Sequence, residues 1–308
     1  MTHDEITRRE FFKRAVAAGL VAYGAGRLAG VGDRPGAEAA APPPTIIVAS
    51  KKSPAALVRA AVDALGGMKK FVKPGNTVVL KPNIAWARKP EQAANTNPEV
   101  VAEVVRLCKS AGAREVKVID HIIDPGEAAV LKISGIGPAA QAAGARVISA
   151  GSLAMYQRVN LKRGKVLKTA EVLRDLMRAD VWINVPIAKV HSGTTVTLGC
   201  KNLMGIVWDR GAWHQSASLD QCIADFAAQF RPKLVILDAV RTLLTNGPKG
   251  PGRTATPGIV VAGTDPLAVD AYGVTLLGRK PQDIGHIRLA YASGVGEMRL
   301  DRIKIRNV

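Results

Sequence analysis

Short apolar runs rich in Val and Ile recur along the chain, and amphipathic segments separate them. In the first half, the apolar runs occupy residues 45–49, 76–81, 115–120 and 146–150, and helical patterning occupies 54–65, 98–110 and 138–143. Short β-branched runs bounded by turn residues predict strands, and their alternation with helices predicts βαβ units. We therefore expect an α/β fold of Rossmann-like type, with a mostly parallel sheet flanked by helices.

The second half begins with a break in this rhythm. Two alternating stretches, 158–161 and 165–168, flank Arg163-Gly164 and predict a small antiparallel hairpin. Alternation then resumes, with strands expected at 181–185, 234–237, 259–262 and 303–306 and helices at 171–177, 219–230, 266–277 and 284–292. Asn97 or Thr96, and Asp265, precede prolines at the start of two helices, where they are expected to act as N-caps.

The first forty residues have the layout of an export signal. Arg8-Arg9 precedes two phenylalanines, a mildly apolar run covers 15–26, and Ala37-Glu38-Ala39, with a small residue at each end as in a cleavage site, precedes three prolines. This order predicts a twin-arginine signal peptide over 1–39, a Pro-rich spacer over 40–44 and a single α/β domain over 45–308. An amphipathic helix with a basic start is the alternative. We expect an exported, periplasmic or extracytoplasmic protein with the twin-arginine translocase as its partner during export.

No apolar run approaches the roughly 20 residues of a bilayer-spanning helix, so we expect no permanent membrane span. The 308 residues carry 43 Lys and Arg against 25 Asp and Glu, a formal charge of +18. The signal contains six basic and five acidic residues, so about +17 stays with the domain. Export and an aromatic content of 4% argue against nucleic acid as a partner. The charge points instead to an anionic small molecule or to a cell-envelope polymer.

Cofactor motifs are sparse. The three cysteines, Cys108, Cys200 and Cys222, form no CxxC pair, so the chain has no self-contained iron–sulfur motif. Walker, GxGxxG and GxSxG sequences are also missing. Because many passengers of the twin-arginine route acquire a cofactor in the cytoplasm before export, a cytoplasmically loaded cofactor of unknown identity stays open.

Candidate chemistry gathers where predicted strands end, since ligands of open α/β sheets bind outside the carboxyl ends of the strands. These ends are Lys81-Pro82-Asn83, Asp120-His121, 184–191, Asp238 and Gly263-Thr264-Asp265. The segment 184–205 is densest in lysine, histidine, hydroxyl and glycine residues, and basic groups with nearby backbone N–H groups suit a carboxylate or phosphate.

We expect catalytic roles for three residues, in which a histidine kept neutral by a nearby lysine acts as general base: His191, His214 and Lys201. We expect ligand binding by seven others: Lys81, Asn83, Lys189, Thr194, Thr195, Asn202 and Asp238. Turns, caps and a solvated basic loop are the alternatives for these residues. Two further alternatives are a metal site built from His191, His214 and Asp238, and a thiolate nucleophile at Cys200.

Several strings resemble a known family. They are Val79-Leu80-Lys81-Pro82-Asn83, Thr96-Asn97-Pro98-Glu99-Val100-Val101, 186–191, 196–198 with Lys201-Asn202-Leu203-Met204-Gly205, His214, Asp238, Gly247-Pro248 with Gly250, and 263–270. Their order resembles the family called domain of unknown function 362 (DUF362) over nearly all of the mature chain. Some members carry ferredoxin-type cysteine motifs, which this sequence lacks.

A fainter similarity is to the lactate racemase family, through the turn Lys73-Pro74-Gly75 before a strand and the later Gly-rich His and Lys segment. That family uses a nickel-bearing pyridinium nucleotide. The similarity implies that Lys189, His191, Lys201 and His214 serve an anionic cofactor or a hydroxy-acid-like substrate.

Taken together, the residues and the resemblance predict an exported enzyme acting on or with an anionic small molecule, by redox, hydride or proton transfer. Two other classes of function fit the same residues. One is a non-catalytic binding protein for an anionic ligand or a cell-envelope polymer. The other is a maturation partner of a redox enzyme.

Overall fold

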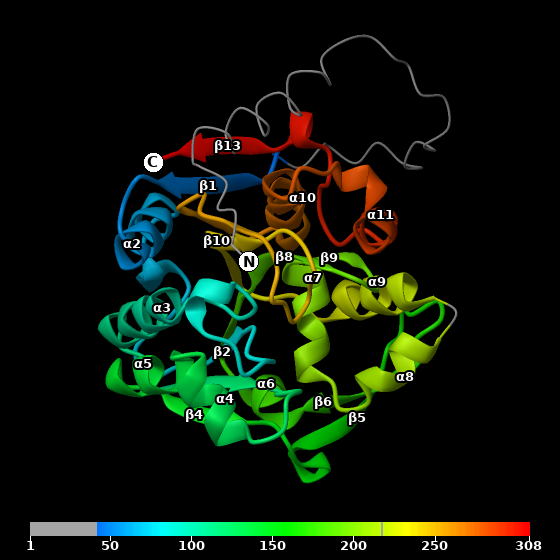
Figure 1. The fold of residues 1–308 in the computed structure, drawn as a ribbon, viewed down its shortest axis with the longest axis horizontal. Coiled ribbons are helices and arrows are strands. Elements are labelled where there is room, and N and C mark those ends of the chain that lie inside the picture. Colours follow the sequence, from blue (N-terminus) through cyan, green and yellow to red (C-terminus); the bar gives the residue numbers. More distant parts are fainter. Residues whose placement is uncertain (1–41, 217) are drawn as a thin grey trace.

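One mixed sheet organises the chain (Figure 1). The computed structural model describes residues 42–216 and 218–308, so the expected signal peptide lies outside the described residues. The strand order across the sheet is β13 (Lys304–Asn307), β1 (Thr45–Ser50), β12 (Ile259–Gly263), β10 (Leu234–Leu243), β7 (Val181–Val185), β2 (Thr77–Pro82), β3 (Glu115–Asp120) and β4 (Arg146–Ser149). Neighbours pair in parallel except at β12, which is antiparallel to β1 and β10. The expected mostly parallel sheet is confirmed.

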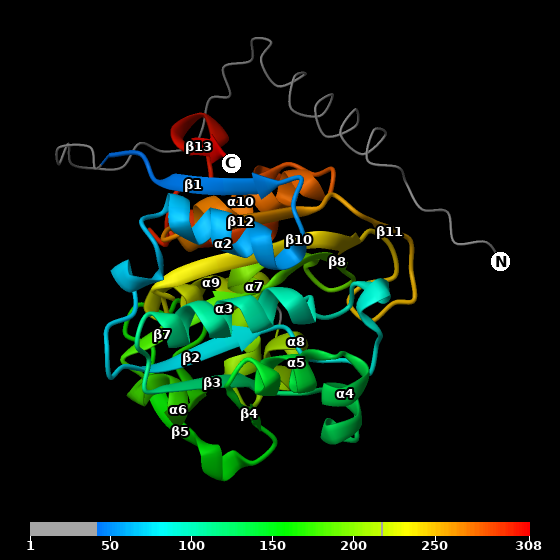
Figure 2. The same cartoon turned by 90° about the vertical axis from the view of Figure 1, so that its left-hand side faces the viewer.

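Helices cover both faces of this sheet (Figure 2). One face carries α2 (Pro54–Ala64), α3 (Pro98–Ser110), α4 (Glu127–Ile133) and α5 (Ile136–Ala142), and the other carries α7 (Gly199–Asn202), α9 (Leu219–Gln229), α10 (Pro266–Leu276) and α11 (Gly285–Ala292). Within β1, Ile46 packs into one hydrophobic core and Ile47 into the other. Burial on both sides explains the uninterrupted apolar runs. In the described part of the chain, no helix is long and apolar enough to span a membrane.

The predicted hairpin is present, but with different bounds. β5 (Tyr156–Asn160) pairs antiparallel with β6 (Thr169–Leu173) as a separate two-stranded sheet. The helix expected at 171–177 is therefore wrong at its start, and α6 covers only Arg174–Arg178. The reason is tertiary: Ala170 and Val172 alternate into the core, and Val172 bridges to Val207.

A second hairpin was not predicted. β8 (Ile187–His191) pairs with β9 (Thr195–Thr197), and β8 also extends alongside β10, as does β11 (Thr254–Ala255). Pro186 separates β8 from β7. Because β8 and β9 are short, their residue pattern cannot be distinguished from that of the turn between them. This hairpin carries Lys189, His191 and Thr197 on one face, since Lys189 pairs with Thr197 and His191 lies two residues further along β8.

The strand order reverses between β2 and β7. From β2 the chain continues outward to β3 and β4, then returns to β7 on the other side of β2 and proceeds to β10. Thr96 joins the two strand ends, because its hydroxyl accepts a hydrogen bond from Asn83 N–H and donates one to the Val185 carbonyl. Asn97 caps α3 and Asp265 caps α10, as expected. Such a switch point is where open α/β sheets form ligand crevices.

Candidate functional site

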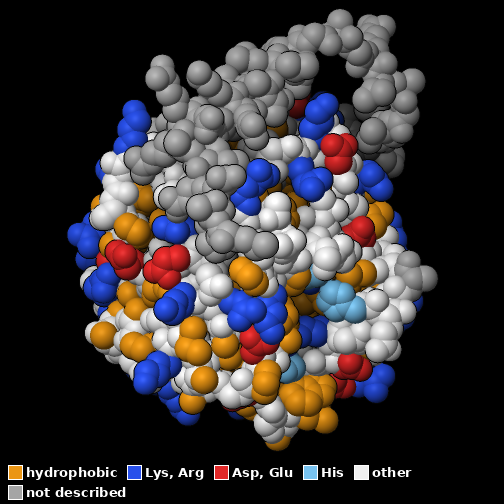
Figure 3. Space-filling view, in the orientation of Figure 1, with side chains coloured by type: hydrophobic (Ala, Val, Ile, Leu, Met, Phe, Trp, Pro, Cys, Tyr) orange, Lys and Arg blue, Asp and Glu red, His pale blue; other side chains and the backbone are white. Residues whose placement is uncertain are grey.

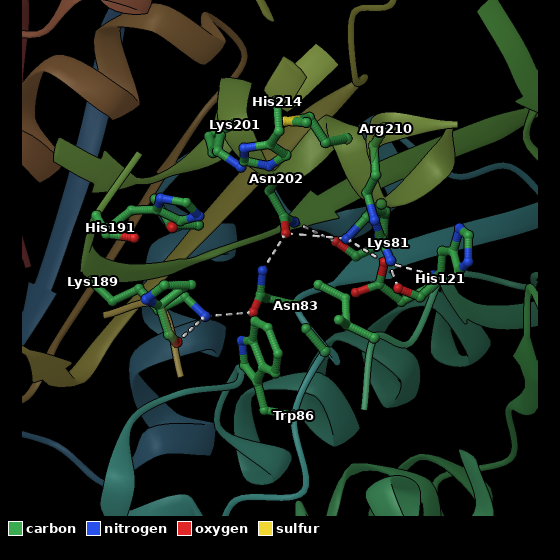
Figure 4. Close-up of a pocket in the computed structure, with 18 of the residues that line it drawn as sticks. Lys81, Asn83, Trp86, His121, Lys189, His191, Lys201, Asn202, Arg210 and His214 are labelled. Carbon is green, nitrogen blue, oxygen red and sulfur yellow. Dashed lines mark hydrogen bonds and ion pairs between the residues drawn. The ribbon is translucent and has the colours of Figure 1, made fainter. Parts of the chain in front are cut away.

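A pocket of about 400 Å³ opens at this switch point (Figure 4). Its basic lining residues are Lys81, Lys189, Lys201, Arg210, His121, His191 and His214. They come from the ends of β2 and β3, from β8, from α7 and from α8 (Arg210–Gln215). On the face shown in Figure 3, histidine side chains reach the surface beside Lys and Arg side chains, between α3 and α8.

Lys81 is the first of three buried pocket lysines. Its ammonium lies 2.9 Å from Asp120 Oδ1, and both side chains are almost fully buried. It also donates to the Pro82 carbonyl and to Asn202 Oδ1. Burial lowers the pKa of Lys81, while Asp120 favours the charged form. The positive charge of Lys81 is thus already matched inside the protein.

Asn202 joins Lys81 to Lys189 across the pocket floor (Figure 4). Its Oδ1 accepts from Lys81 and, at 2.9 Å, from Asn83 Nδ2. Its Nδ2 donates to Asn184 Oδ1 at 2.8 Å. Asn83 Oδ1 in turn accepts from Lys189 at 3.0 Å. Asn202 and Asn83 therefore hold Lys81 and Lys189 in fixed positions.

Lys189 is surrounded by neutral oxygens. Besides Asn83, its ammonium donates to the carbonyls of Ala94 and Pro248. All three of its hydrogens are engaged, and it makes no ion pair with a carboxylate among the described residues. Burial lowers the pKa of Lys189 to about 7, and the positive charges of Lys201 and Lys81 add to this shift.

Lys201 differs from both. The short helix α7 that carries it begins where the Asp270 carboxylate accepts hydrogen bonds from the N–H groups of Gly199 and Cys200. Lys201 is 8% exposed and makes no hydrogen bond or ion pair with any residue that the structure describes. The pKa of Lys201 is lowered to about 7. Burial is the main cause, and the positive charges of Arg210 and Lys81 lower it further. Within residues 42–216 and 218–308, Lys201 is thus a buried basic group without a partner.

His191 and His214 stack at the mouth, with ring centroids 6.1 Å apart and planes 15° apart. His191 Nδ1 accepts from the Gly193 N–H at 2.9 Å, so the proton of the neutral ring is on Nε2. Burial first, and then the charges of Lys201 and Lys189, lower the pKa of His191 to about 2. His214 is exposed, and partial burial and Lys201 lower its pKa. Both rings are neutral at physiological pH.

Three of the expected ligand-binding residues do not line the pocket. Thr194 donates to the Val196 carbonyl, and Thr195 lies in β9 opposite His191. Asp238 accepts from the N–H groups of Asn97 and Val240, and burial raises its pKa to about 6. Asp238 therefore supports the start of α3.

The metal and thiolate alternatives find no support in this geometry. In residues 42–216 and 218–308, no three His, Cys, Asp or Glu side chains are placed to hold a metal ion, and Asp238 does not line the pocket that contains the two histidines. Cys200 is buried, and burial and Asp270 raise its pKa, so it is a neutral thiol. All three cysteines are free and buried.

The lining residues that were absent from the expected site include Trp86, His121, Thr197 and Arg210. His121 follows a predicted strand end, so its position was recognisable. Arg210 and Trp86 lie in loops or short helices that no sequence pattern connects to the pocket. Thr197 was hidden because the β8–β9 hairpin was not predicted.

Comparison with known proteins identifies the family of this chain. The model of the family described as "Domain of unknown function (DUF362)" matches residues 78–275. The chain belongs to this family. The DUF362 protein is also 30% identical over 247 residues to the thylakoid-associated protein sll1697 of Synechocystis sp., a match covering 74% of this chain and 71% of that protein.

Two solved structures resemble this DUF362 protein at low identity. They are the lactate racemase apoprotein of Thermoanaerobacterium thermosaccharolyticum, with 12% identity and a TM-score of 0.45, and a protein of Thermotoga maritima, with 10% identity and a TM-score of 0.42. The matches cover 68% and 77% of this chain. They span 54% and 59% of the respective solved chains.

Proposed function

We propose that this DUF362 protein is an enzyme that binds a small organic anion in the pocket and exchanges a proton with it. The observation that carries the proposal is the ammonium of Lys201, which has no partner among the residues that the structure describes. A buried cation without a counter-charge is costly, and a bound anion would remove that cost. Lys81 and Lys189 do not offer such a site, because their hydrogens are already engaged.

Two further donors support anion binding beside Lys201. Arg210 donates to the His121 carbonyl but forms no ion pair with a carboxylate of the described residues, so its guanidinium is available for a charged ligand. Thr197 Oγ1 is buried, lines the pocket and makes no hydrogen bond with any described residue. Thr197 lies opposite Lys189 and on the same face as His191.

The proton chemistry follows from the protonation states. Arg210 keeps its charge and binds the anion, whereas Lys201, with a pKa of about 7, exchanges its proton readily at neutral pH. Neutral His191 offers Nε2–H to an oxygen on which negative charge develops. His214, exposed and stacked on His191, connects this group to solvent.

The test separates binding from proton exchange. Full-length protein is titrated calorimetrically with a panel of small carboxylates, and exchange of their C–H protons in D₂O is followed by ¹H NMR. Lys201→Arg keeps the charge but cannot release a proton, so we expect affinity within about threefold and exchange slower by about 100-fold. Arg210→Gln is expected to weaken binding by about tenfold. Arg279→Gln, an exposed site outside the pocket, is the matched control.

One observation favours a second candidate, a non-catalytic anion-binding protein. Among the described residues that line the pocket, Asp120 is the single carboxylate, and it is paired with Lys81. Tight anion binding with no accelerated exchange, unchanged in Lys201→Arg, would establish the binding protein and reject the enzyme.

A further inference from the structure

The pocket has two chemically different parts. Lys201 and His214 lie on one side, and Trp86 lies across the pocket from them (Figure 4). His121 stands at a third side. The lining also includes the apolar side chains of Ala85, Ile123 and Met204. A hydrophilic anion alone would occupy the cationic side and leave the ring-lined side filled with water.

Trp86 is held at its backbone and contacted by a cation at its ring. The side chain of Asn95 accepts hydrogen bonds from the N–H groups of Ala85 and Trp86 and donates one to the Trp86 carbonyl. The ammonium of Lys249 lies 5.3 Å from the centroid of the indole ring, and it forms a 2.7 Å ion pair with Asp124. The backbone at Trp86 is therefore held by Asn95, and a paired cation lies over its indole ring.

His121 is supported in the same manner. Its ring stacks on Trp208, with centroids 5.2 Å and planes 16° apart, and Trp208 packs edge-on against Tyr156 at 5.3 Å. Burial lowers the pKa of His121, which keeps the ring neutral. Arg210 donates to the His121 carbonyl and so ties this ring to the anion-binding group.

We propose that the ligand of the pocket is an aromatic carboxylate, with its carboxylate at Lys201 and Arg210 and its ring between Trp86 and His121. This inference rests on the proposed function and names its substrate class. A volume of about 400 Å³ suits a ring system with a short acidic group. Preorganised flat side chains gain stacking and apolar burial without losing conformational freedom on binding.

The experiment uses three probes and the full-length protein. By calorimetry, 2-naphthoate carries both ring and charge, acetate carries only the charge, and 2-naphthylmethanol carries only the ring. We expect 2-naphthoate to bind about 100-fold more tightly than acetate and at least about tenfold more tightly than the alcohol. Trp86→Ala should cost about tenfold for 2-naphthoate and leave acetate unchanged, and Trp86→Phe should restore most of the loss.

The two ways of failing are distinguishable. If acetate or inorganic phosphate binds as tightly as 2-naphthoate, with Arg210→Gln weakening both, the aromatic class is overturned and the proposed anion site stands. If no probe that carries a charge binds more tightly than 2-naphthylmethanol, the proposed function itself fails. The wild-type selectivity decides the matter even if Trp86→Ala does not fold.

Discussion

Three lysines of the pocket show how surroundings, not residue type, decide a role. Lys81 is matched by Asp120, Lys189 by three neutral oxygens, and Lys201 by no described residue. In the sequence all three occur near predicted strand ends or in one Gly-rich segment, so all three were expected to contact ligand or catalyse. Only their partners separate a structural ion pair from a group available to an anion.

The pKa of Lys201 predicts how anion binding varies with pH. In the free protein Lys201 loses its charge as the pH rises through about 7, and a bound anion raises its pKa, so above pH 7 binding must take up a proton. We expect affinity for a carboxylate to be nearly constant below pH 7 and to fall by up to about tenfold per pH unit above it.

Calorimetry between pH 6 and 9, in two buffers of different ionisation enthalpy, measures both affinity and proton uptake. Lys201→Arg should give a flat profile, which distinguishes Lys201 from Lys189, whose pKa is also about 7. A wild-type affinity that does not change between pH 7 and 9 would contradict the assignment.

At the scale of elements, the site depends on close approach between α7 with its following turn and the ends of β2 and β3. The string Lys201-Asn202-Leu203-Met204-Gly205 was recognised from the sequence as typical of the family. The structure explains its glycine: a Cβ at Gly205 would lie 2.1 Å from Asp120 Oδ1 and 2.6 Å from Lys81 Cε. Both neighbours are buried and paired, so neither has room to move.

Gly205→Ala is therefore expected to destabilise the protein by about 2–4 kcal/mol, through overpacking and a disturbed buried ion pair. Urea unfolding measures the loss. Gly211→Ala is the matched control, because the nearest atom to its Cβ would be Asp209 Oδ1 at 3.6 Å. Gly211 lies in α8, so Gly211→Ala should leave the free energy of unfolding unchanged or raise it by about 0.5–1 kcal/mol. Equal stability of both variants would contradict this expectation and show that Lys81 and Asp120 can move to accommodate a Cβ.

At the scale of the whole molecule, two helical layers bury one sheet, and the reversal of strand order creates the crevice. Residues 40–308 carry about +17 of the formal charge, and three lysines and one arginine line the pocket. Part of the excess of basic residues therefore lies in the pocket. The rest is distributed over the surface and is consistent with an anionic environment.

We propose that this folded domain is exported by the twin-arginine route. The motivating feature is the order Arg8-Arg9, apolar run, small residues and prolines. In a bacterium with that pathway, the double variant Arg8→Lys with Arg9→Lys is expected to remain full-length in the cytoplasm, whereas the wild type is processed near residue 40. Fractionation and mass spectrometry of the N-terminus read the result. Arg14→Lys is the control, and normal export of the double variant would reject the proposal.

The sequence alone determined the α/β class, most strand and helix positions, two N-caps and the family resemblance, because these depend on local periodicity, turn chemistry and contiguous strings. The β8–β9 hairpin, the partner of each lysine and the role of Asp238 required the tertiary structure. These features arise from contacts between distant residues: Lys81 meets Asn202 across 121 positions, and Asp238 meets Asn97 across 141. Local sequence patterns do not show such pairs, so only the tertiary structure identified Lys201 as the pocket lysine without a partner among the described residues, and Trp86 and His121 as pocket residues.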